Sequence, residues 1–225
     1  ALLGSGTVGS GVSEVLRMNV RELAERVGKN IVLKKVLVRD IKKPRKNIDM
    51  SLLTDDFESI VNDKDIDIVV EVMGGLHPAK EYMLRAIEAG KSIVTANKDV
   101  LATYGKDVLG AAERAGVDFQ FEASVGGGIP IITSLKQSLT ANKITEVMGI
   151  VNGTTNFILD AMATRNLSYE AALKQAQELG FAEADPSADV EGLDAAAKCA
   201  ILASLAFHTR VGIEDVEVEG ITRIT

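Results

Sequence analysis

The chain starts with Ala1-Leu2-Leu3-Gly4-Ser5-Gly6-Thr7-Val8-Gly9, in which a short apolar run leads into a Gly-x-Gly-x-x-Gly pattern and then a helix. Between a strand and a helix, this pattern predicts a dinucleotide-binding turn. Gly4 permits the tight turn, Gly6 lets a pyrophosphate approach the backbone, and Gly9 allows close helix–strand packing. The helix start at Thr7 and Val8 supplies N–H groups and partial positive charge for the phosphates. A plain glycine turn is the alternative.

Strand and helix signals alternate outward from this turn. Strands are predicted at 1–3, 31–38, 66–73, 92–95 and 117–121, and helices from Gly9 to about Val27 and at 55–61, 78–89 and 107–115, with Gly28, Gly90 and Gly116 closing three of them. Strands separated by helices indicate βαβ units. The expected fold class is α/β, with a Rossmann-type, mostly parallel, doubly wound sheet.

The pattern changes after Gly126-Gly127-Gly128. Helices are predicted at 131–139, 156–164, 169–179 and 190–207, and a strand at 144–151. We therefore expect two domains: a cofactor-binding domain over residues 1–128 and an α+β substrate-binding and dimerisation domain over residues 129–225.

Composition narrows the class of protein. The 225 residues are 46% hydrophobic, enough for a proper core, and the net charge of −7 argues against nucleic acid or an anionic membrane as partner. Cys199 is the only cysteine, which excludes an internal disulfide and fits a reducing, cytoplasmic location. No apolar run approaches the roughly 18 residues of a membrane span. Both ends resemble mid-domain sequence, so we expect a fragment of a longer protein.

The second predicted strand ends at Val38-Arg39-Asp40. An acidic residue at this position binds the ribose 2′-hydroxyl of NAD, whereas an arginine favours the 2′-phosphate of NADP. Both types are adjacent here, with Lys42 and Lys43 close behind, so the sequence favours NADP, with dual use open. A solvated polar turn is the alternative.

Two further segments have a functional and a structural interpretation. Lys98 follows the strand at 92–95, and the carboxyl ends of parallel strands face the ligand, so Lys98 could reach a cofactor or a substrate oxygen; otherwise it only starts a surface helix. Residues 122–130 place glycine-rich backbone beside Glu122, which suits either a hard cation bound by oxygen or a domain hinge. The residues alone favour the hinge.

The stretch from Gly180 to Phe207 gathers five carboxylates ahead of Lys198. Asp194 and Lys198 are spaced i,i+4 on a predicted helix, so they share a face. An exposed pair of this kind contributes only about 0.3–0.5 kcal/mol. The helix beyond Lys198 is apolar on every side, which predicts burial, Cys199 included. A partly buried lysine needs a paired charge or a function. Residues 152–156 are interpreted as a helix cap.

Together these segments resemble homoserine dehydrogenase. The similarity runs in order along essentially the whole chain, and the motifs that carry it are GSGTVGSGV, VRD, EVMGG, TANKDVLA, FEASVGGGIPII, GIVNGTTNFIL and GFAEADPSADVEGLDAAAK. The resemblance implies NAD(P)-dependent interconversion of L-homoserine and L-aspartate 4-semialdehyde, in threonine, methionine and isoleucine biosynthesis. It also implies a homodimer or higher homo-oligomer.

The resemblance also implies roles for individual residues. Lys198 matches the catalytic acid/base lysine, assisted by Lys98 and Asp194, while Glu183 and Asp194 match the carboxylates that bind homoserine. The implied cofactor site comprises Gly4, Gly6, Thr7, Val8, Gly9, Arg39, Gly74, Lys98 and Gly180. A monovalent cation, Na⁺ or K⁺, is implied at Glu122, Val125, Gly127 and Ile129, which reverses the preference for a hinge.

Two departures from the family pattern affect these expectations. The family's catalytic part continues past residue 225, and no regulatory ACT domain is present in this sequence. One alternative is a cofactor-binding fragment without turnover. Another is a different two-domain dehydrogenase linked to aldehyde chemistry, but such enzymes use a cysteine in a defined loop, and Cys199 lies in a predicted helix.

Overall fold

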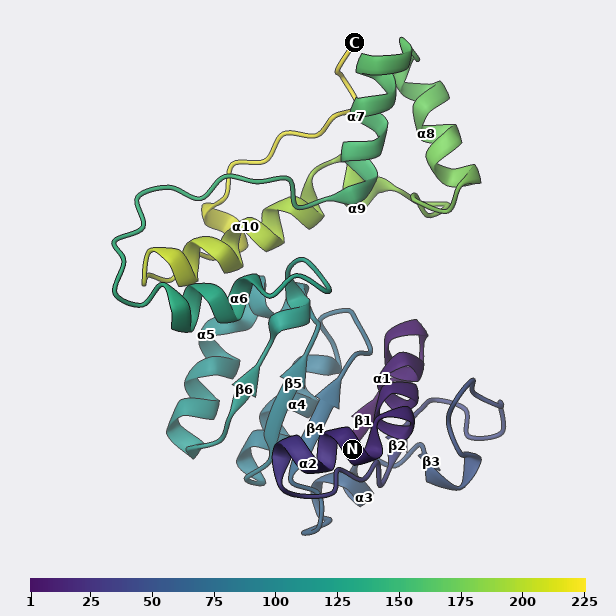
Figure 1. The fold of residues 1–225 in the computed structure, drawn as a ribbon, viewed down its shortest axis with the longest axis vertical. Coiled ribbons are helices and arrows are strands. Elements are labelled where there is room, and N and C mark those ends of the chain that lie inside the picture. Colours follow the sequence, from purple (N-terminus) through teal and green to yellow (C-terminus); the bar gives the residue numbers. More distant parts are fainter. The chain divides into compact units, whose positions relative to one another are not determined.

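The computed structural model describes all 225 residues, which form two compact units, Ala1–Ser124 and Val125–Thr225. The first unit is built on a six-stranded sheet (Figure 1). Its strands are β1 (Leu2–Leu3), β2 (Val36–Leu37), β3 (Leu53–Thr54), β4 (Ile68–Glu71), β5 (Ser92–Thr95) and β6 (Phe119–Gln120).

The strand order is β3-β2-β1-β4-β5-β6, and every neighbouring pair is parallel. The chain moves outward in one direction from β1 to β3 and in the other from β4 to β6. The order therefore reverses between β1 and β4, which is the point where doubly wound sheets bind their ligands, at the carboxyl ends of the strands. The α/β class with a doubly wound parallel sheet is confirmed, whereas the α+β class expected for residues 129–225 is wrong, because no strand follows β6.

Helices cover both faces of this sheet (Figure 1). They are α1 (Thr7–Met18), α2 (Val20–Val27), α3 (Glu58–Val61), α4 (Ala79–Glu88) and α5 (Lys98–Ala115), with short 3₁₀ turns η1 (Met50–Leu52) and η2 (Glu122–Ser124). Right-handed crossovers that leave β1 and β4 in opposite directions require opposite faces. The strand residues Leu2, Leu3, Val36, Val69 and Ile93 are fully buried between the layers.

Several predicted boundaries in the first unit were wrong. Only Val36–Leu37 of the strand predicted at 31–38 pairs in the sheet, and Ile31 and Val32 are exposed. The helix after the glycine turn breaks at Asn19 into α1 and α2. Helix α5 begins at Lys98 rather than residue 107, because the Asn97 side chain caps it. The predicted caps at Gly28 and Gly116 are present, both left-handed.

The second unit contains helices joined by irregular segments. They are α6 (Ile131–Thr133), the π-helical turn η3 (Ser134–Ser138), α7 (Gly153–Arg165), α8 (Tyr169–Glu178), α9 (Ser187–Val190), α10 (Leu193–Ala206) and the 3₁₀ turn η4 (Ile213–Asp215). Small apolar residues of α7, α8 and α9 form one core cluster, which includes Ile158, Ala161, Ala172 and Ala176. Because alanine side chains are short, these helices can approach one another closely.

Three predictions for this unit were wrong. Residues 144–151 form no strand, since a strand needs a hydrogen-bonded neighbour and no other segment of the chain supplies one. The helix predicted at 190–207 is broken by Gly192, whose φ of +82° is left-handed. Cys199 is exposed, because α10 buries the side that carries Ala196, Ala200 and Ile201. An apolar sequence on every side of a helix does not say which side packs.

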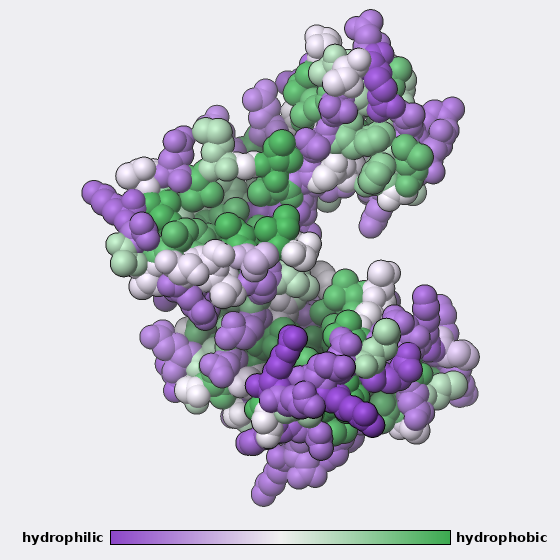
Figure 2. Space-filling view, viewed as in Figure 1, coloured by the Kyte–Doolittle hydropathy of each residue, from purple (hydrophilic) through white to green (hydrophobic).

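Apolar side chains also lie on the surface of the second unit (Figure 2). Met148 is 85% exposed and Ile150 79%, both in the irregular segment before α7. Phe181, Leu193 and Phe207 are exposed as well. Despite this apolar surface, no helix of the structure is both long and apolar enough to cross a bilayer.

Candidate active site

The glycine turn between β1 and α1 has the geometry that its spacing predicts. Gly4 has a φ of +99°, and a Cβ atom there would lie 2.9 Å from the Val72 carbonyl oxygen. A Cβ on Gly9 would collide with the Gly4 carbonyl oxygen, whereas a Cβ on Gly6 would meet nothing within 4 Å. Two glycines are therefore required by packing, and Gly6 faces open space that a ligand could use.

The start of α1 presents backbone donors beside this space. The first hydrogen bond of the helix runs from the Ser10 N–H to the Gly6 carbonyl, at 2.9 Å, and no side chain caps the helix. The N–H groups of Thr7, Val8 and Gly9 precede that bond, so they are the helix's orphan donors. This is an arrangement that binds phosphate groups.

A buried hydrogen-bond network supports the carboxyl ends of β4 and β5. Glu71, the last residue of β4, is 0% exposed. Its Oε1 accepts the Met73 N–H at 2.8 Å and its Oε2 accepts the Thr95 hydroxyl at 2.8 Å. The Thr95 hydroxyl in turn accepts the Asn97 N–H at 3.0 Å, and the Asn97 amide donates to the Gly75 carbonyl at 2.8 Å. The network thus joins the loop after β4 to the loop after β5.

This network places two predicted site residues of the first unit. Gly74 lies in the loop that Glu71 and Asn97 hold, with a φ of +75° and no atom within 4 Å of its would-be Cβ. Lys98 is the first residue of α5, which starts where Asn97 accepts the Val100 N–H at 3.1 Å. The Lys98 side chain is 31% exposed, and its Nζ lies 4.0 Å from Asp99 Oδ1.

The residues after β2 differ in how far their side chains are engaged. Asp40 Oδ1 accepts the Lys42 N–H at 2.9 Å, in a local turn. Arg39 is exposed. One carboxylate oxygen of Asp40 is therefore already used within the protein, whereas the Arg39 guanidinium can meet an incoming anion.

In the second unit, Lys198 is held at the start of α10. Its Nζ donates to Asp194 Oδ2 at 2.6 Å and to the Val151 carbonyl at 2.7 Å. The Lys198 and Asp194 side chains are only 17% and 11% exposed, so this is not the solvated surface pair of the alternative interpretation. An ammonium has three donors, and the third remains for a ligand oxygen.

Asn152 completes this cluster. It is 7% exposed, and its Nδ2 donates to Asp194 Oδ2 at 2.8 Å and to Asp189 Oδ1 at 2.7 Å. Its Oδ1 accepts the Thr155 N–H at 2.8 Å, which caps α7. The structure therefore brings together Asn152, Asp189, Asp194 and Lys198. Such a cluster can hold a proton donor next to a polar substrate.

The other predicted residues of the second unit lie in the loop between α8 and α9. Gly180 follows the cap residue of α8 and has a φ of +77°. Glu183 is exposed and makes no hydrogen bond to Lys198. The Gln177 amide fixes the Glu183 carbonyl at 3.1 Å, so the backbone is held while the side chain points to solvent. The Ser187 hydroxyl and N–H hold the pKa of Asp185 below its ordinary value, which marks Asp185 as a turn former.

The residues of the predicted cation site lie on either side of the division between the units. Glu122 belongs to η2 of the first unit. In the second unit, Gly126 and Gly128 have φ values of +60° and +85°, and the Ile129 carbonyl accepts the Ile131 N–H at 2.8 Å. No cluster of three or more acidic, histidine or cysteine side chains suited to a metal exists in the structure. A cation here would depend on backbone carbonyls.

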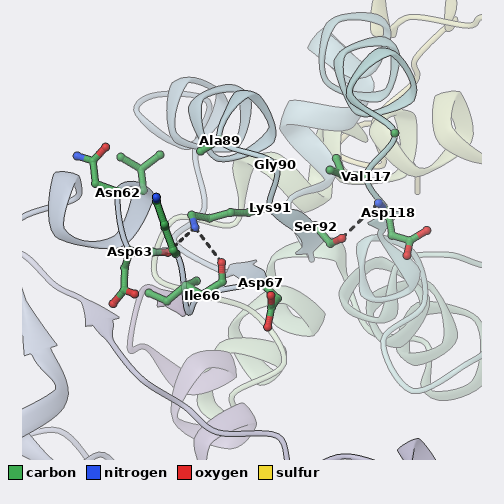
Figure 3. A pocket seen from close by; sticks show the side chains of 13 residues that line it. Asn62, Asp63, Ile66, Asp67, Ala89, Gly90, Lys91, Ser92, Val117 and Asp118 are labelled. Atoms are coloured by element: carbon green, nitrogen blue, oxygen red, sulfur yellow. Dashed lines mark hydrogen bonds between the residues drawn. The ribbon is translucent and has the colours of Figure 1, made fainter.

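A cavity of about 470 Å³ opens at the other end of the sheet, where the strands begin (Figure 3). The loops that lead into β4, β5 and β6 line it, with Asp63, Lys91 and Asp118 among its residues. Lys91 is buried, and its Nζ donates to the Asp63 and Ile66 carbonyls at 2.7 and 2.8 Å. The cavity lies at the amino ends of the strands, away from the carboxyl ends where such sheets bind ligands, and its buried Lys91 already donates to backbone carbonyls.

Sequence reasoning missed two residues of these networks. Glu71 stands in the apolar run IDIVVEVM, where only its charge was a signal. Asn152 was interpreted as a helix cap, which it is, but its amide also reaches two carboxylates 37 and 42 residues further along the chain. The bonds from Thr95 to Glu71 and from Asn152 to the two carboxylates span 24 to 42 residues, so no short-range pattern predicts them.

Comparison with known proteins covers both units. A family model described as homoserine dehydrogenase, NAD binding domain matches residues 4–122, and one described as homoserine dehydrogenase matches residues 130–225. The chain is 50% identical to a homoserine dehydrogenase of Bacillus subtilis and 53% identical to one of Synechocystis, over all of its 225 residues. It covers 52% of each, so the chain spans about half the length of these relatives.

Solved structures give the same picture. The crystal structure of a homoserine dehydrogenase from Thiobacillus denitrificans matches the whole chain with a TM-score of 0.92 at 46% identity, and the chain covers 52% of it. A hyperthermophilic archaeal homoserine dehydrogenase in complex with NADPH matches 96% of the chain with a TM-score of 0.79 at 26% identity, and 73% of that protein is covered. With two family models matched in order along its length, this chain belongs to the homoserine dehydrogenase family.

Proposed function

We propose that the protein containing this chain interconverts L-homoserine and L-aspartate 4-semialdehyde with a nicotinamide cofactor. The observation that carries the proposal is the Lys198 ammonium, held by Asp194 and the Val151 carbonyl, with one donor left for a substrate. The relatives that are 50% and 53% identical to this chain are named homoserine dehydrogenases. When bound, the cofactor supplies the hydride acceptor or donor at the nicotinamide ring.

Lys198 is the residue that moves the proton in this proposal. Its ammonium donates a proton as the substrate carbonyl becomes an alcohol, and its neutral form accepts that proton in the reverse direction. Asp194 holds the amine in place through the bond at 2.6 Å. Lys98 assists by placing positive charge near the oxygen where negative charge develops.

Glu183 is assigned to the ammonium group of homoserine. Its exposed carboxylate, on a loop whose backbone Gln177 fixes, is open to a ligand. A carboxylate that pairs with a substrate ammonium contributes mainly to binding, since the charge of that group does not change during hydride transfer. Gly180 in the same loop, with its left-handed backbone, is assigned to the nicotinamide side.

The first unit is assigned to the cofactor, and NADP is the preferred form. The glycine turn and the orphan N–H groups of Thr7, Val8 and Gly9 suit a pyrophosphate. Asp40 is already engaged by the Lys42 N–H, which weakens its use for a ribose 2′-hydroxyl. The exposed Arg39 suits a 2′-phosphate.

A monovalent cation at Glu122, Val125, Gly127 and Ile129 stays a prediction, as do a homodimer and a cytoplasmic location. The left-handed Gly126 and Gly128 support the cation site, because they turn the backbone so that carbonyls can converge on an ion. Replacing Na⁺ and K⁺ by a bulky organic cation at constant ionic strength should lower turnover. Unchanged turnover would contradict a functional cation site.

Homoserine-dependent formation of reduced cofactor by the full-length protein tests the proposal. We expect the ultraviolet absorbance of NADPH to rise when L-homoserine and NADP are supplied, and more slowly with NAD. A protein that binds NADPH but shows no homoserine-dependent turnover would instead be a binding module. Turnover with a different alcohol or aldehyde would identify another dehydrogenase.

A further inference from the structure

Asn152 makes more contacts than a helix cap requires. Ser168 caps α8 through one bond, to the Ala171 N–H at 3.3 Å. Asn152 caps α7 in the same way, but its Oδ1 also accepts the Thr155 hydroxyl at 2.9 Å, and its Nδ2 donates to Asp189 and Asp194. A serine would have been a sufficient cap, so the amide nitrogen needs another explanation.

The cap fixes the orientation of this amide. The Thr155 N–H can only donate, so the atom 2.8 Å away must be the Asn152 carbonyl oxygen. The NH₂ group then faces the two carboxylates, each of which can only accept when ionised. The reverse orientation would place an acceptor against two acceptors and leave the helix donor unpaired. Side-chain burial, with 7% exposed, leaves little room for another rotamer.

The Asn152 NH₂ group forms a bridge between two carboxylates, which carry like charge. Asp189 Oδ1 and Asp194 Oδ2 each accept one hydrogen of the same NH₂ group, at 2.7 and 2.8 Å. Asp194 Oδ2 is also the oxygen that accepts Lys198 Nζ at 2.6 Å. The position of that oxygen, and through it the position of the ammonium, therefore depends on Asn152. The preceding residue, Val151, supplies the other acceptor for Lys198 at 2.7 Å.

We propose that Asn152 is a positioning residue for the proton-transfer lysine. Its amide holds the Asp194 carboxylate in the place where Lys198 pairs with it. The NH₂ group lies between the Asp189 and Asp194 carboxylates and donates one hydrogen bond to each, which offsets their mutual repulsion. The inference rests on the proposed function only for its effect on turnover. Its structural part, that Asn152 restrains the Lys198 ammonium, stands independently of the reaction.

Two variants of the full-length protein separate the bridge from the cap. Asn152→Ser and Asn152→Asp both keep an oxygen that can accept the Thr155 N–H, but both remove the NH₂ group. We expect kcat to fall roughly 10- to 100-fold in each, as for the loss of a hydrogen bond to a charged group. The KM for the cofactor should change less than about twofold, because Asn152 is not among the residues proposed to bind the cofactor.

The control variant is Ser168→Ala, which removes the cap of α8 and a hydrogen bond to Glu170 but leaves Asp189, Asp194 and Lys198 with all their partners. It should lower the melting temperature, as the loss of a helix cap does, but leave kcat unchanged. If Asn152→Ser is folded and its kcat stays within about twofold of the wild type, the catalytic part of the inference is wrong. A fall in kcat of the same size in Ser168→Ala would reduce the role of Asn152 to stability.

Labelling of Lys198 by a lysine-acylating reagent, followed by mass spectrometry, tests the inference without turnover. Asn152→Ser should raise the labelling rate of Lys198 several-fold, because its partner carboxylate is less well held. Asn152→Asp should lower that rate, because a third carboxylate favours the unreactive ammonium. Equal rates in all three proteins would overturn the inference, even if the wild type oxidises homoserine. If the labelling rates are as predicted but the protein does not oxidise homoserine, the inference about Asn152 holds and the proposed function is wrong.

Discussion

Each unit of the chain contains an acidic side chain in a polar network, and the two networks differ in their partners. Glu71 is fully buried at the end of β4, and its partners are a backbone N–H and a hydroxyl, with no cation. Asp194 of the second unit is mostly buried, 11% exposed, and its partners include the Asn152 amide and the Lys198 ammonium.

The difference separates a structural frame, the Glu71 network, from the Asp194–Lys198 pair that we propose takes part in the reaction. The Glu71 network closes through Thr95, Asn97 and Gly75, so every member is fixed by another. The backbone it holds, at Val72 and Met73, is also the backbone that a Cβ atom on Gly4 of the glycine turn would meet. Lys198, in contrast, sits on a flexible stem with one donor to spare. A fixed network gives geometry, whereas a lysine with an open donor can exchange a proton.

The largest effect is expected from Lys198→Ala. Loss of the proton donor should lower kcat by roughly 10²- to 10⁴-fold, the usual contribution of general acid–base catalysis. Cofactor affinity, measured by NADPH fluorescence titration, should not change, since no residue of α10 is proposed to bind the cofactor. Near-normal turnover in this variant would contradict the proposed catalytic role of Lys198, which would then be structural, as Glu71 is.

In the Glu71 network, the counterpart of Lys198→Ala is Glu71→Ala. It removes the acceptors of the Met73 N–H and the Thr95 hydroxyl in a site with 0% exposure, and it leaves a cavity. We expect a loss of about 3 kcal/mol in the free energy of unfolding, measured by denaturant titration. Glu88→Ala, at an exposed position of α4, serves as control and should stay within about 0.5 kcal/mol. Equal stability of both variants would show that Glu71 is not part of a frame.

A smaller effect is expected from Glu183→Gln. Because Glu183 is exposed and separate from the Lys198 pair, its loss should raise the KM for homoserine about 10-fold and change kcat little. Initial rates over a range of homoserine concentrations separate the two constants. A fall in kcat with an unchanged KM would place Glu183 with the reacting group instead of with binding.

The smallest effect is expected from Arg39→Ala, on the exposed side of the first unit. It should weaken NADPH binding several-fold and leave NADH binding unchanged, because only NADPH carries the 2′-phosphate. Fluorescence titrations with both cofactors give the ratio of the two dissociation constants. The same loss for both cofactors would mean that Arg39 contacts a part they share, and the preference for NADP would lose its support.

Local patterns predicted the elements that depend on local physics. The strand at Ser92–Thr95 has the predicted bounds, and left-handed glycines end α2 and α5 where the sequence placed them. The parallel, doubly wound sheet followed from the alternation of strands and helices. The pair Asp194–Lys198 followed from i,i+4 spacing, because one helical turn brings such residues together whatever surrounds the helix.

Predictions failed where the outcome depended on distant residues. Residues 144–151 have a strand-like sequence, but pairing requires a neighbour that sequence periodicity does not provide. Glycine is needed at the break because of crowding as well as because of its φ, since a Cβ there would lie 3.0 Å from Val218 Cγ1. Cys199 stands in an apolar helix, yet only one side of that helix is buried.

The sequence by itself determined the sheet, the glycine turn, the pairing of Asp194 with Lys198 and the membership of a family. Each depends on spacings of a few residues or on motifs that stand in order along the chain. Only the tertiary structure decided that Glu71 is held by neutral donors and that Asn152 joins two carboxylates 37 and 42 residues away. The physical reason is that hydrogen bonds of buried groups are completed by whatever the fold brings near, which no local pattern encodes.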